Sequence, residues 1–305
     1  MTSKSVLKIL CGVARLPFLT LTALCIALAA SSVWYQYGHF SLSLTGLVLL
    51  MALAAHISVN AFNEYFDFHS GLDHLTERTP FSGGSGTLVA APEQTKLALL
   101  LAISCLLFVT VAGLWLGAQH GWQLLWLGIP GVLLIYSYTQ YVNKLPLLCL
   151  IAPGLGFGGF MTLGAYWVLA GQLDALALSV SALLALLISN LLLLNQFPDV
   201  DADQQVGRRH LPIVLGRKPS AHIYRGLLVS CYALLLLAVW QQWLPAFSLL
   251  ALFTLPLALV LMRDVSRYAD APKQLVPTLG RNVLLTHALP ALVLAGLILE
   301  KTLGA

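Results

Sequence analysis

Long stretches without a charged side chain constrain the fold of this chain more than any other feature of its sequence. They include residues 16–63, 97–143, 226–262 and 282–299. Only 9% of the residues are charged, whereas an ordinary soluble domain carries about 25%. Each stretch is long enough for one or two helices of roughly 20 residues, the length that crosses a bilayer. The sequence therefore predicts an all-α, polytopic membrane protein with a single membrane-embedded domain over residues 1–305.

The apolar runs predict nine transmembrane helices. The strands of a transmembrane barrel would alternate apolar and polar residues, and these runs do not. The nine predicted spans are 17–36, 40–62, 97–117, 122–140, 148–170, 175–197, 222–241, 243–262 and 282–299.

The distribution of Lys and Arg predicts how the chain is oriented. With nine spans, one side of the membrane receives the N-terminus and the loops after spans 2, 4, 6 and 8. Of the 16 basic residues, all except Lys301 fall on that side. They are Lys4, Lys8, Arg15, Arg78, Lys96, Lys144, Arg208, Arg209, Arg217, Lys218, Arg225, Arg263, Arg267, Lys273 and Arg281. Cytoplasmic loops carry such an excess, so the N-terminus is predicted to be cytoplasmic and the C-terminus outside. The net charge of +4 serves topology, and no nucleic-acid partner is expected.

Two acidic clusters interrupt the apolar sequence on the predicted cytoplasmic side. Each begins with an asparagine followed four residues later by an aspartate, and each comes at the end of a span. The clusters follow spans 2 and 6, which hints at a repeated four-helix unit over 17–140 and 148–262, with a ninth helix after it. The candidate metal ligands in the clusters are Asn63, Asp67, Asp73, Asn195, Asp199 and Asp203.

The residue types in these clusters favour magnesium. Amide and carboxylate oxygens without a thiolate suit Mg²⁺ better than zinc, and Mg²⁺ is commonly held by one or two carboxylates together with substrate phosphate oxygens. Basic side chains near the clusters are placed to contact phosphate. These are Arg78, Lys144, Arg208 and Arg209. The alternative is ordinary solvated loop charge, which we prefer for Glu77, Asp201, Arg217 and Lys218.

Span 2 carries a polar stripe toward its cytoplasmic end. At 100° per residue, His56, Asn60, Asn63 and Asp67 fall within about 60° of one helical face. A polar stripe in lipid faces the bundle interior or a water-filled cavity. His56 is either a neighbour of the site or a partner in a helix–helix hydrogen bond, and Glu64 points about 100° away from Asn63. By the same reasoning, Asn195 and Asp199 share a face of span 6 and Asp201 points elsewhere.

Two glycine-rich segments have different interpretations. Residues 78–86 form either a lid over phosphate or a flexible connection, since glycine permits close backbone approach. Residues 154–159 lie inside an apolar span without a strand before them. Close helix packing is therefore the preferred reading of this second segment.

The motifs resemble those of the UbiA superfamily of intramembrane prenyltransferases. The cluster from Asn63 to Asp73 is similar to the first Asp-rich motif of that family, and the cluster from Asn195 to Asp203 to the second. The segment 136–144 lies where the family has a tyrosine-to-lysine loop motif. The resemblance extends over essentially the whole chain. It implies a UbiA-type bundle of nine helices with both motifs on the cytoplasmic side.

Within this superfamily, the chain is most similar to the polyprenyltransferases that act on 1,4-dihydroxy-2-naphthoate in menaquinone synthesis. The similar features are the Gly-x-Asp ending of the first motif at Asp73, the glycine run 154–158 and the segment 207–211. The chain departs from the pattern at Glu64, where Asp is frequent, and at His210, which replaces a Thr. These departures leave the acceptor more open than the reaction.

The resemblance implies Mg²⁺-dependent transfer of a polyprenyl group from a polyprenyl diphosphate to an aromatic acceptor, with two Mg²⁺ ions bridging the diphosphate. It gives catalytic roles to Asp67, Asp73 and Lys144. It gives substrate-binding roles to Asn60, Arg78, Tyr136, Lys144, Arg208 and Arg209. The isoprenoid tail is expected among helices open to membrane lipid, in the inner membrane of a bacterium, with the C-terminus in the periplasm.

Three alternatives remain open at this point. The acceptor of the same reaction could be 4-hydroxybenzoate, homogentisate or a secondary metabolite. A cation-coupled transporter also places carboxylates in broken helices, but its charges lie near the membrane midplane. A CDP-alcohol phosphotransferase would need its carboxylates in one short segment, whereas here more than a hundred residues separate them.

Overall fold

The computed structural model describes residues 3–304, and within that range the chain is helical without a strand. The predicted limits, residues 1 and 305, lie outside the described part. Ten helices form the body of the protein: α2 (Leu19–Tyr37), α3 (Leu42–His69), α6 (Thr95–His120), α7 (Leu125–Gln140), α8 (Pro146–Gly154), α9 (Leu163–Ala170), α10 (Ala175–Asn195), α13 (Arg217–Trp240), α14 (Leu255–Tyr268) and α15 (Pro272–Leu303). Five short or peripheral helices complete it: α1 (Ser3–Ala14), α4 (Leu72–Leu75), α5 (Thr87–Ala90), α11 (Val200–Gln205) and α12 (Leu211–Val214).

Eight helical segments within residues 3–304 are long and apolar enough to cross a membrane. They are Leu16–Tyr37, Leu42–His69, Pro92–His120, Pro146–Ala170, Ala175–Asn195, Arg217–Trp240, Ala246–Tyr268 and Pro272–Leu303. The remaining predicted span, 122–140, corresponds mainly to α7, which has 16 residues and is shorter than the roughly 20 that cross a bilayer. The all-α membrane bundle is confirmed, and the count of nine spans stays a prediction.

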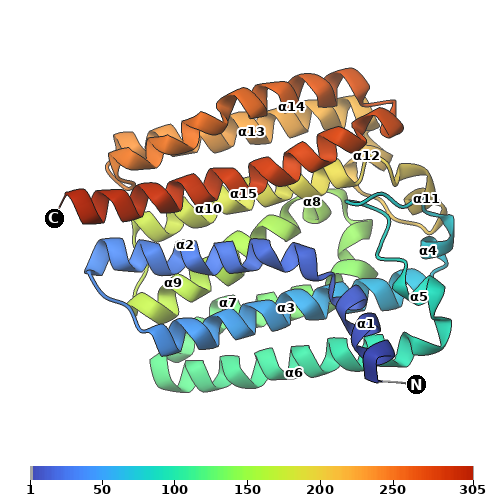
Figure 1. The fold of residues 1–305 in the computed structure, drawn as a ribbon, viewed down its shortest axis with the longest axis horizontal. Coiled ribbons are helices and arrows are strands. Elements are labelled where there is room, and N and C mark those ends of the chain that lie inside the picture. The colour runs from blue at the N-terminus through green and yellow to red at the C-terminus, as the bar shows by residue number, and fades with distance from the viewer. Residues whose placement is uncertain (1–2, 305) are drawn as a thin grey trace.

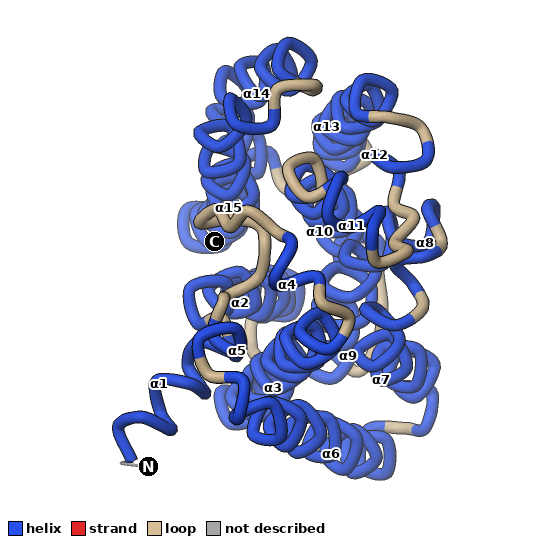
Figure 2. Tube along the Cα trace, turned by 90° about the vertical axis from the view of Figure 1, so that its right-hand side faces the viewer, coloured by secondary structure: helices blue, strands red, loops and turns tan. Residues whose placement is uncertain are grey.

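The long helices lie side by side, and the short helices α4, α5, α11 and α12 gather at one end of the bundle (Figure 1). Seen from that end, the long helices form a ring of cylinders, with α4 and α11 in front of its centre (Figure 2). Helix α10 lies in the interior, and most of its side chains are buried. Because α10 is apolar on all sides, it satisfies the pattern of a helix enclosed by other helices.

The glycine run after α8 allows a close approach to α10. A Cβ atom on Gly154 would lie 2.2 Å from the carbonyl oxygen of Ala185, and one on Gly158 would lie 2.3 Å from that of Ser181. Residues 155–162 form a π-helix, a rare form that often occurs at functional sites. Close helix packing, the preferred reading of this run, is confirmed.

Three predicted boundaries are wrong. Helix α3 continues to His69, beyond the predicted end at residue 62, and α14 and α15 occupy most of the predicted loop 263–281. These helices continue after the apolar run ends, because a helix can extend past the membrane boundary into water. Helix α10 ends at Asn195, before Pro198, since a proline disfavours helical backbone in the residue before it. The sequence predicts that Asn195 and Asp199 share a face of span 6. This prediction is wrong, because the two residues do not belong to one continuous helix.

Candidate active site

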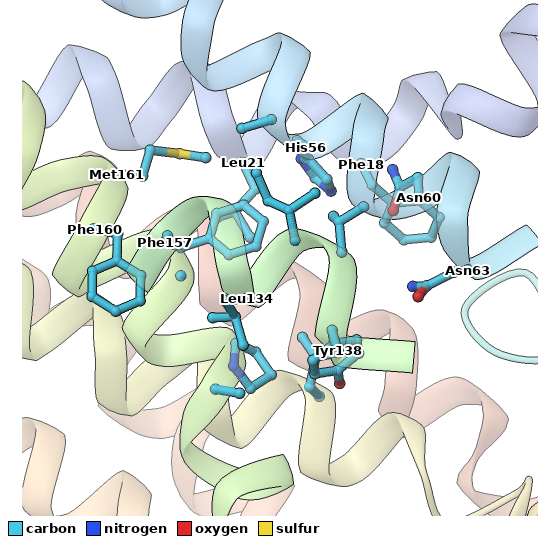
Figure 3. Close-up of a pocket in the computed structure, with 18 of the residues that line it drawn as sticks. Phe18, Leu21, His56, Asn60, Asn63, Leu134, Tyr138, Phe157, Phe160 and Met161 are labelled. Atoms are coloured by element: carbon cyan, nitrogen blue, oxygen red, sulfur yellow. The ribbon is translucent and has the colours of Figure 1, made fainter. Parts of the chain in front are cut away.

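A cavity of about 450 Å³ lies inside the bundle and follows one face of α3. Along α3 its lining residues are Val48, Met51, Ala52, Ala55, His56, Val59, Asn60, Asn63 and Asp67. Nineteen residues separate Val48 from Asp67, which at 1.5 Å per residue is about 28 Å, close to the thickness of the hydrocarbon core. Figure 3 shows His56, Asn60 and Asn63 in a row along one side of the cavity, with Leu134 and Tyr138 across from them. The cavity is long, apolar along most of its length and polar at one end.

The polar end brings together the two acidic clusters. All six candidate metal ligands line the cavity there: Asn63, Asp67, Asp73, Asn195, Asp199 and Asp203. Helix α3 carries the first two, α4 carries Asp73, and α10 ends at Asn195. The turn after α10 and helix α11 carry the last two. The fold thus joins motifs that begin 132 residues apart in the sequence.

Arg208 forms a bridge between the two motifs. Its Nη2 atom donates to Asp67 Oδ1, and its Nη1 atom donates to Asp203 Oδ1 at 2.9 Å. The other oxygen of Asp203, Oδ2, lies 2.8 Å from His210 Nε2. All three partners of this network are largely buried. Arg208 therefore shares its one positive charge between a carboxylate of each motif.

A second buried ion pair lies beside the polar stripe of α3, and its arginine, Arg15, also lines the cavity. Glu64 is fully buried and accepts from Arg15 Nε at 2.8 Å and from Arg15 Nη2 at 2.5 Å. It also accepts from the Ser85 backbone N–H at 2.9 Å and from the Ser85 hydroxyl at 2.6 Å. Arg15 has a left-handed backbone with φ 52°, a conformation that costs free energy for any residue except glycine. This pair fixes α1 and the glycine-rich segment against α3.

The glycine-rich segment lies over the polar end of the cavity. Ser82, Gly83 and Gly84 line the cavity wall, and both glycines have positive φ. A Cβ atom on Gly84 would lie 2.7 Å from Asp73 Oδ1. The backbone therefore passes against the Asp73 carboxylate, at a distance that a side chain at position 84 would prevent.

Several buried oxygen atoms at the polar end suit a cation. Asp73 Oδ2, Asn195 Oδ1 and Asp199 Oδ1 are buried and have no hydrogen-bond partner among residues 3–304. Buried oxygens without a donor are costly, and a divalent ion with oxygen ligands would satisfy them. Within residues 3–304, however, no three His, Cys, Asp or Glu side chains are gathered as a ready-made metal site. The donor set fits Mg²⁺, but the side chains must rearrange to surround it.

Burial changes the acid–base behaviour of two of these carboxylates. It raises the pKa of Asp73 to about 7, with Glu64 and Asp67 adding to the shift and Arg15 and Arg78 opposing it. Burial likewise raises the pKa of Asp199 to about 7, with the Asp203 charge adding and Arg208 opposing. Each group therefore holds a proton below about pH 7 that a metal ion must displace.

This proton competition predicts a pH dependence of metal binding. Below about pH 7, Asp73 and Asp199 bind protons, and a ligand must lose its proton to coordinate a metal. We expect the Mg²⁺ concentration for half-saturation to rise about tenfold for each displaced proton between pH 7 and pH 6, and to level off above pH 8. Metal titrations of the diphosphate-free protein at several pH values measure this. An affinity that does not change from pH 6 to pH 8 would contradict it, and Asp201→Asn should keep the wild-type profile.

The structure places the other predicted substrate-binding residues differently. Asn60 lines the cavity, and its Nδ2 atom donates to the Ala14 carbonyl at 3.0 Å. Lys144 and Arg209 are exposed, and Arg78 donates to the Asp73 backbone carbonyl. Tyr136 is 45% exposed and packs edge-on against Phe62 and Phe66. None of these last four lines the cavity.

Sequence reasoning missed four residues at the site. The charge pattern gives Arg15 only a topological role and the helical stripe leaves Glu64 ambiguous, whereas the two form a buried ion pair. The sequence marks His210 only as a departure from a motif, whereas it contacts Asp203. Asn143 lines the cavity and has a buried, unpartnered Oδ1. Two features of the sequence could have indicated such roles. Arg15 stands directly before the first apolar run, and Asn143 stands directly before Lys144.

Comparisons with known proteins agree with this fold. The model of the UbiA prenyltransferase family matches residues 22–282. A UbiA homologue from Aeropyrum pernix K1 is similar in structure with a TM-score of 0.63 at 19% identity, covering 92% of this chain and 97% of that one. A UbiA homologue from Archaeoglobus fulgidus, solved with DMAPP and Mg²⁺, gives a TM-score of 0.57 at 14% identity, with coverage of 94% and 99%. These two likenesses concern the fold.

Relatives with functional names are less than one-third identical. The 1,4-dihydroxy-2-naphthoate octaprenyltransferase of Bacillus subtilis is 27% identical over 56% of this chain, which spans 54% of that enzyme. A UbiA prenyltransferase domain-containing protein 1 homologue of Drosophila melanogaster is 30% identical over 76% of this chain and 63% of its own length. The 1,4-dihydroxy-2-naphthoate octaprenyltransferase of Escherichia coli is 28% identical over 84% and 85%. With a family model that covers most of its length and a matching fold, the chain belongs to the UbiA prenyltransferase family.

Proposed function

We propose that this protein transfers a polyprenyl group from a polyprenyl diphosphate to an aromatic acceptor, with Mg²⁺ as cofactor. The observation that carries the proposal is the form of the cavity. Six amide and carboxylate ligands surround one end, and an apolar channel continues from it along α3. A polyprenyl diphosphate has the same two parts, a charged head and a long apolar tail. The solved A. fulgidus homologue, with DMAPP and Mg²⁺ bound, supports this assignment.

The residues at the polar end divide the work on the diphosphate. Asn63, Asp67, Asp73, Asn195, Asp199 and Asp203 would hold Mg²⁺, as two ions in our proposal. The metal would supply Lewis-acid neutralisation of the charge that develops on the leaving diphosphate. Arg208 lines the cavity beside these ligands and can donate two parallel hydrogen bonds to phosphate. Arg78, Lys144 and Arg209 contribute positive charge around the same end of the protein.

The apolar part of the cavity protects the reaction from water. Loss of diphosphate leaves an allylic cation, which water would otherwise capture. Phe157, Phe160 and Tyr138 line the cavity, and aromatic faces attract cations. The electron-rich ring carbon of the acceptor then forms the new carbon–carbon bond and loses its proton. Tyr136 lies outside this wall, against Phe62 and Phe66, where it supports the polar end of α3.

We further propose 1,4-dihydroxy-2-naphthoate as the acceptor, in menaquinone synthesis. Two relatives named for that activity, from B. subtilis and E. coli, support this choice. We also propose that the protein lies in a bacterial inner membrane, surrounded by lipid, with the active-site loops cytoplasmic and the C-terminus periplasmic. The one-sided distribution of Lys and Arg supports this orientation, because cytoplasmic loops carry an excess of basic residues.

A panel of acceptors tests this proposal. Membranes containing the protein are incubated with Mg²⁺, a labelled polyprenyl diphosphate and, separately, 1,4-dihydroxy-2-naphthoate, 4-hydroxybenzoate or homogentisate. We expect prenylated naphthoate as the main product, identified by its mass. Prenylation of 4-hydroxybenzoate or homogentisate alone would keep the reaction and overturn the acceptor. Membranes without the protein provide the control.

A further inference from the structure

The four carboxylates at the polar end fall into two unlike pairs. Asp67 and Asp203 both accept from the Arg208 guanidinium, and the second oxygen of Asp203 is held by His210. Among the described residues, Asp73 and Asp199 each keep one buried oxygen without a hydrogen-bond partner. One pair therefore shares a single positive charge supplied by the protein, and the other pair has oxygens left for a cation.

The contacts of Arg208 resemble those of a bound cation. Its side chain is 19% exposed and reaches one carboxylate in each motif. An arginine side chain stays protonated in proteins. Its guanidinium therefore stabilises two carboxylates that would otherwise repel one another across the cavity.

We propose, as an extension of the function proposed above, that Arg208 is the resident counter-cation of the Asp67–Asp203 pair in the metal-free protein. Asp73 and Asp199 can bind a divalent ion without displacing Arg208 from its carboxylate partners. Asp67 and Asp203 can take one only after Arg208 has moved away from them. The two halves of the site are therefore loaded in sequence.

The diphosphate is the group that draws Arg208 away. A guanidinium fork binds phosphate with the same paired geometry as carboxylate. When the diphosphate enters the polar end, Arg208 can exchange its carboxylate partners for phosphate oxygens, and the pair it leaves becomes available to metal. The full set of metal ligands therefore becomes available only when the substrate is bound. Before that, Arg208 reduces the repulsion between Asp67 and Asp203.

Metal binding without diphosphate tests this role. Purified protein in detergent is titrated with Mn²⁺ alone, and unbound Mn²⁺ is followed by electron paramagnetic resonance. Replacing Arg208 by Gln removes a positive charge from two carboxylates of the site, so we expect Arg208→Gln to bind Mn²⁺ about tenfold or more tightly than the wild type. Equal or weaker binding by a folded Arg208→Gln protein would overturn the proposal.

Thermal unfolding provides a second readout. Without metal, Arg208→Gln leaves the buried Asp67 carboxylate without its partner and Asp203 with only His210, so its melting temperature should fall below that of the wild type. Saturating Mn²⁺ should remove most of this difference. An arginine with a purely structural role would leave the variant destabilised with and without metal, which would also contradict the proposal.

Two further variants keep the test interpretable. Arg217→Gln is the matched control, since Arg217 pairs with the exposed Asp201 at 3.3 Å, and its Mn²⁺ affinity should equal that of the wild type. If Arg208→Gln does not fold, Arg208→Lys keeps the charge but loses the fork that bridges two carboxylates. That variant should bind Mn²⁺ several-fold more tightly than the wild type, and no increase would overturn the proposal.

The outcome also separates this inference from the function on which it rests. A wild-type protein that transfers prenyl groups, with Mn²⁺ affinity unchanged in Arg208→Gln, would disprove the counter-cation role alone. A wild-type protein that neither binds Mn²⁺ nor transfers prenyl groups would disprove both.

Discussion

Asp67→Ala and Asp199→Ala should each lower the rate of prenyl transfer by roughly 10²–10³ or more, the effect of removing one group that stabilises developing charge. Both residues line the polar end of the cavity, one from each motif. Asp201→Ala should cost much less. Its side chain is 81% exposed and pairs with Arg217 at 3.3 Å, and such surface pairs are worth about 0–1 kcal/mol.

The comparison requires equal amounts of folded protein in the membrane. Prenylated product is measured in membranes at matched protein levels, and thermal unfolding in detergent checks that each variant is folded. Asp201 is the matched control because it lies between Asp199 and Asp203 in the sequence but points into solvent. If Asp201→Ala proves as inactive as Asp199→Ala, the second cluster surrounds its metal from several directions and the present assignment is wrong.

Removal of metal should abolish activity, and Mg²⁺ or Mn²⁺ should restore it. The candidate ligand atoms at the polar end are oxygens, and Asp73, Asn195 and Asp199 each keep a buried oxygen that has no hydrogen-bond partner in the described part of the chain. Without a cation, the leaving diphosphate would face these negative groups unshielded. The measurement is product formation in excess EDTA, followed by addition of each ion. Full activity in the chelator would disprove the metal-dependent mechanism.

The stripe along span 2 shows what the sequence could predict. Its polar residues recur every three or four positions, and in a lipid environment such a face must be enclosed. His56, Asn60, Asn63 and Asp67 all line one cavity. The alternation between apolar runs and charged loops likewise predicted an all-α bundle, because a membrane allows few other structures.

Other features depended on contacts between distant parts of the chain. The bridge from Arg208 to Asp67 joins residues 141 positions apart, and the ion pair of Arg15 with Glu64 joins residues 49 positions apart. Glu64 neighbours the stripe but points about 100° away from Asn63, so the helical pattern leaves its role ambiguous. Its burial becomes understandable only when α1 and Ser85 are packed against the same face of α3.

The sequence also could not predict that the side chains of Lys144 and Arg209 are exposed to solvent. Both follow residues that line the cavity, Asn143 and Arg208. A change of one position in a loop is enough to turn a side chain from the cavity to solvent, and no periodic pattern fixes the direction of a loop residue.

The central claim concerns the bond that the protein makes, and purified protein in lipid vesicles tests it most directly. The vesicles receive Mg²⁺, a polyprenyl diphosphate and 1,4-dihydroxy-2-naphthoate, and both the prenylated product and the released diphosphate are quantified. We predict one diphosphate released for each molecule of prenylated acceptor, with both formed roughly 10²–10³-fold or more slowly by Asp67→Ala. Release of diphosphate without any prenylated aromatic product, whichever acceptor is supplied, would contradict the account.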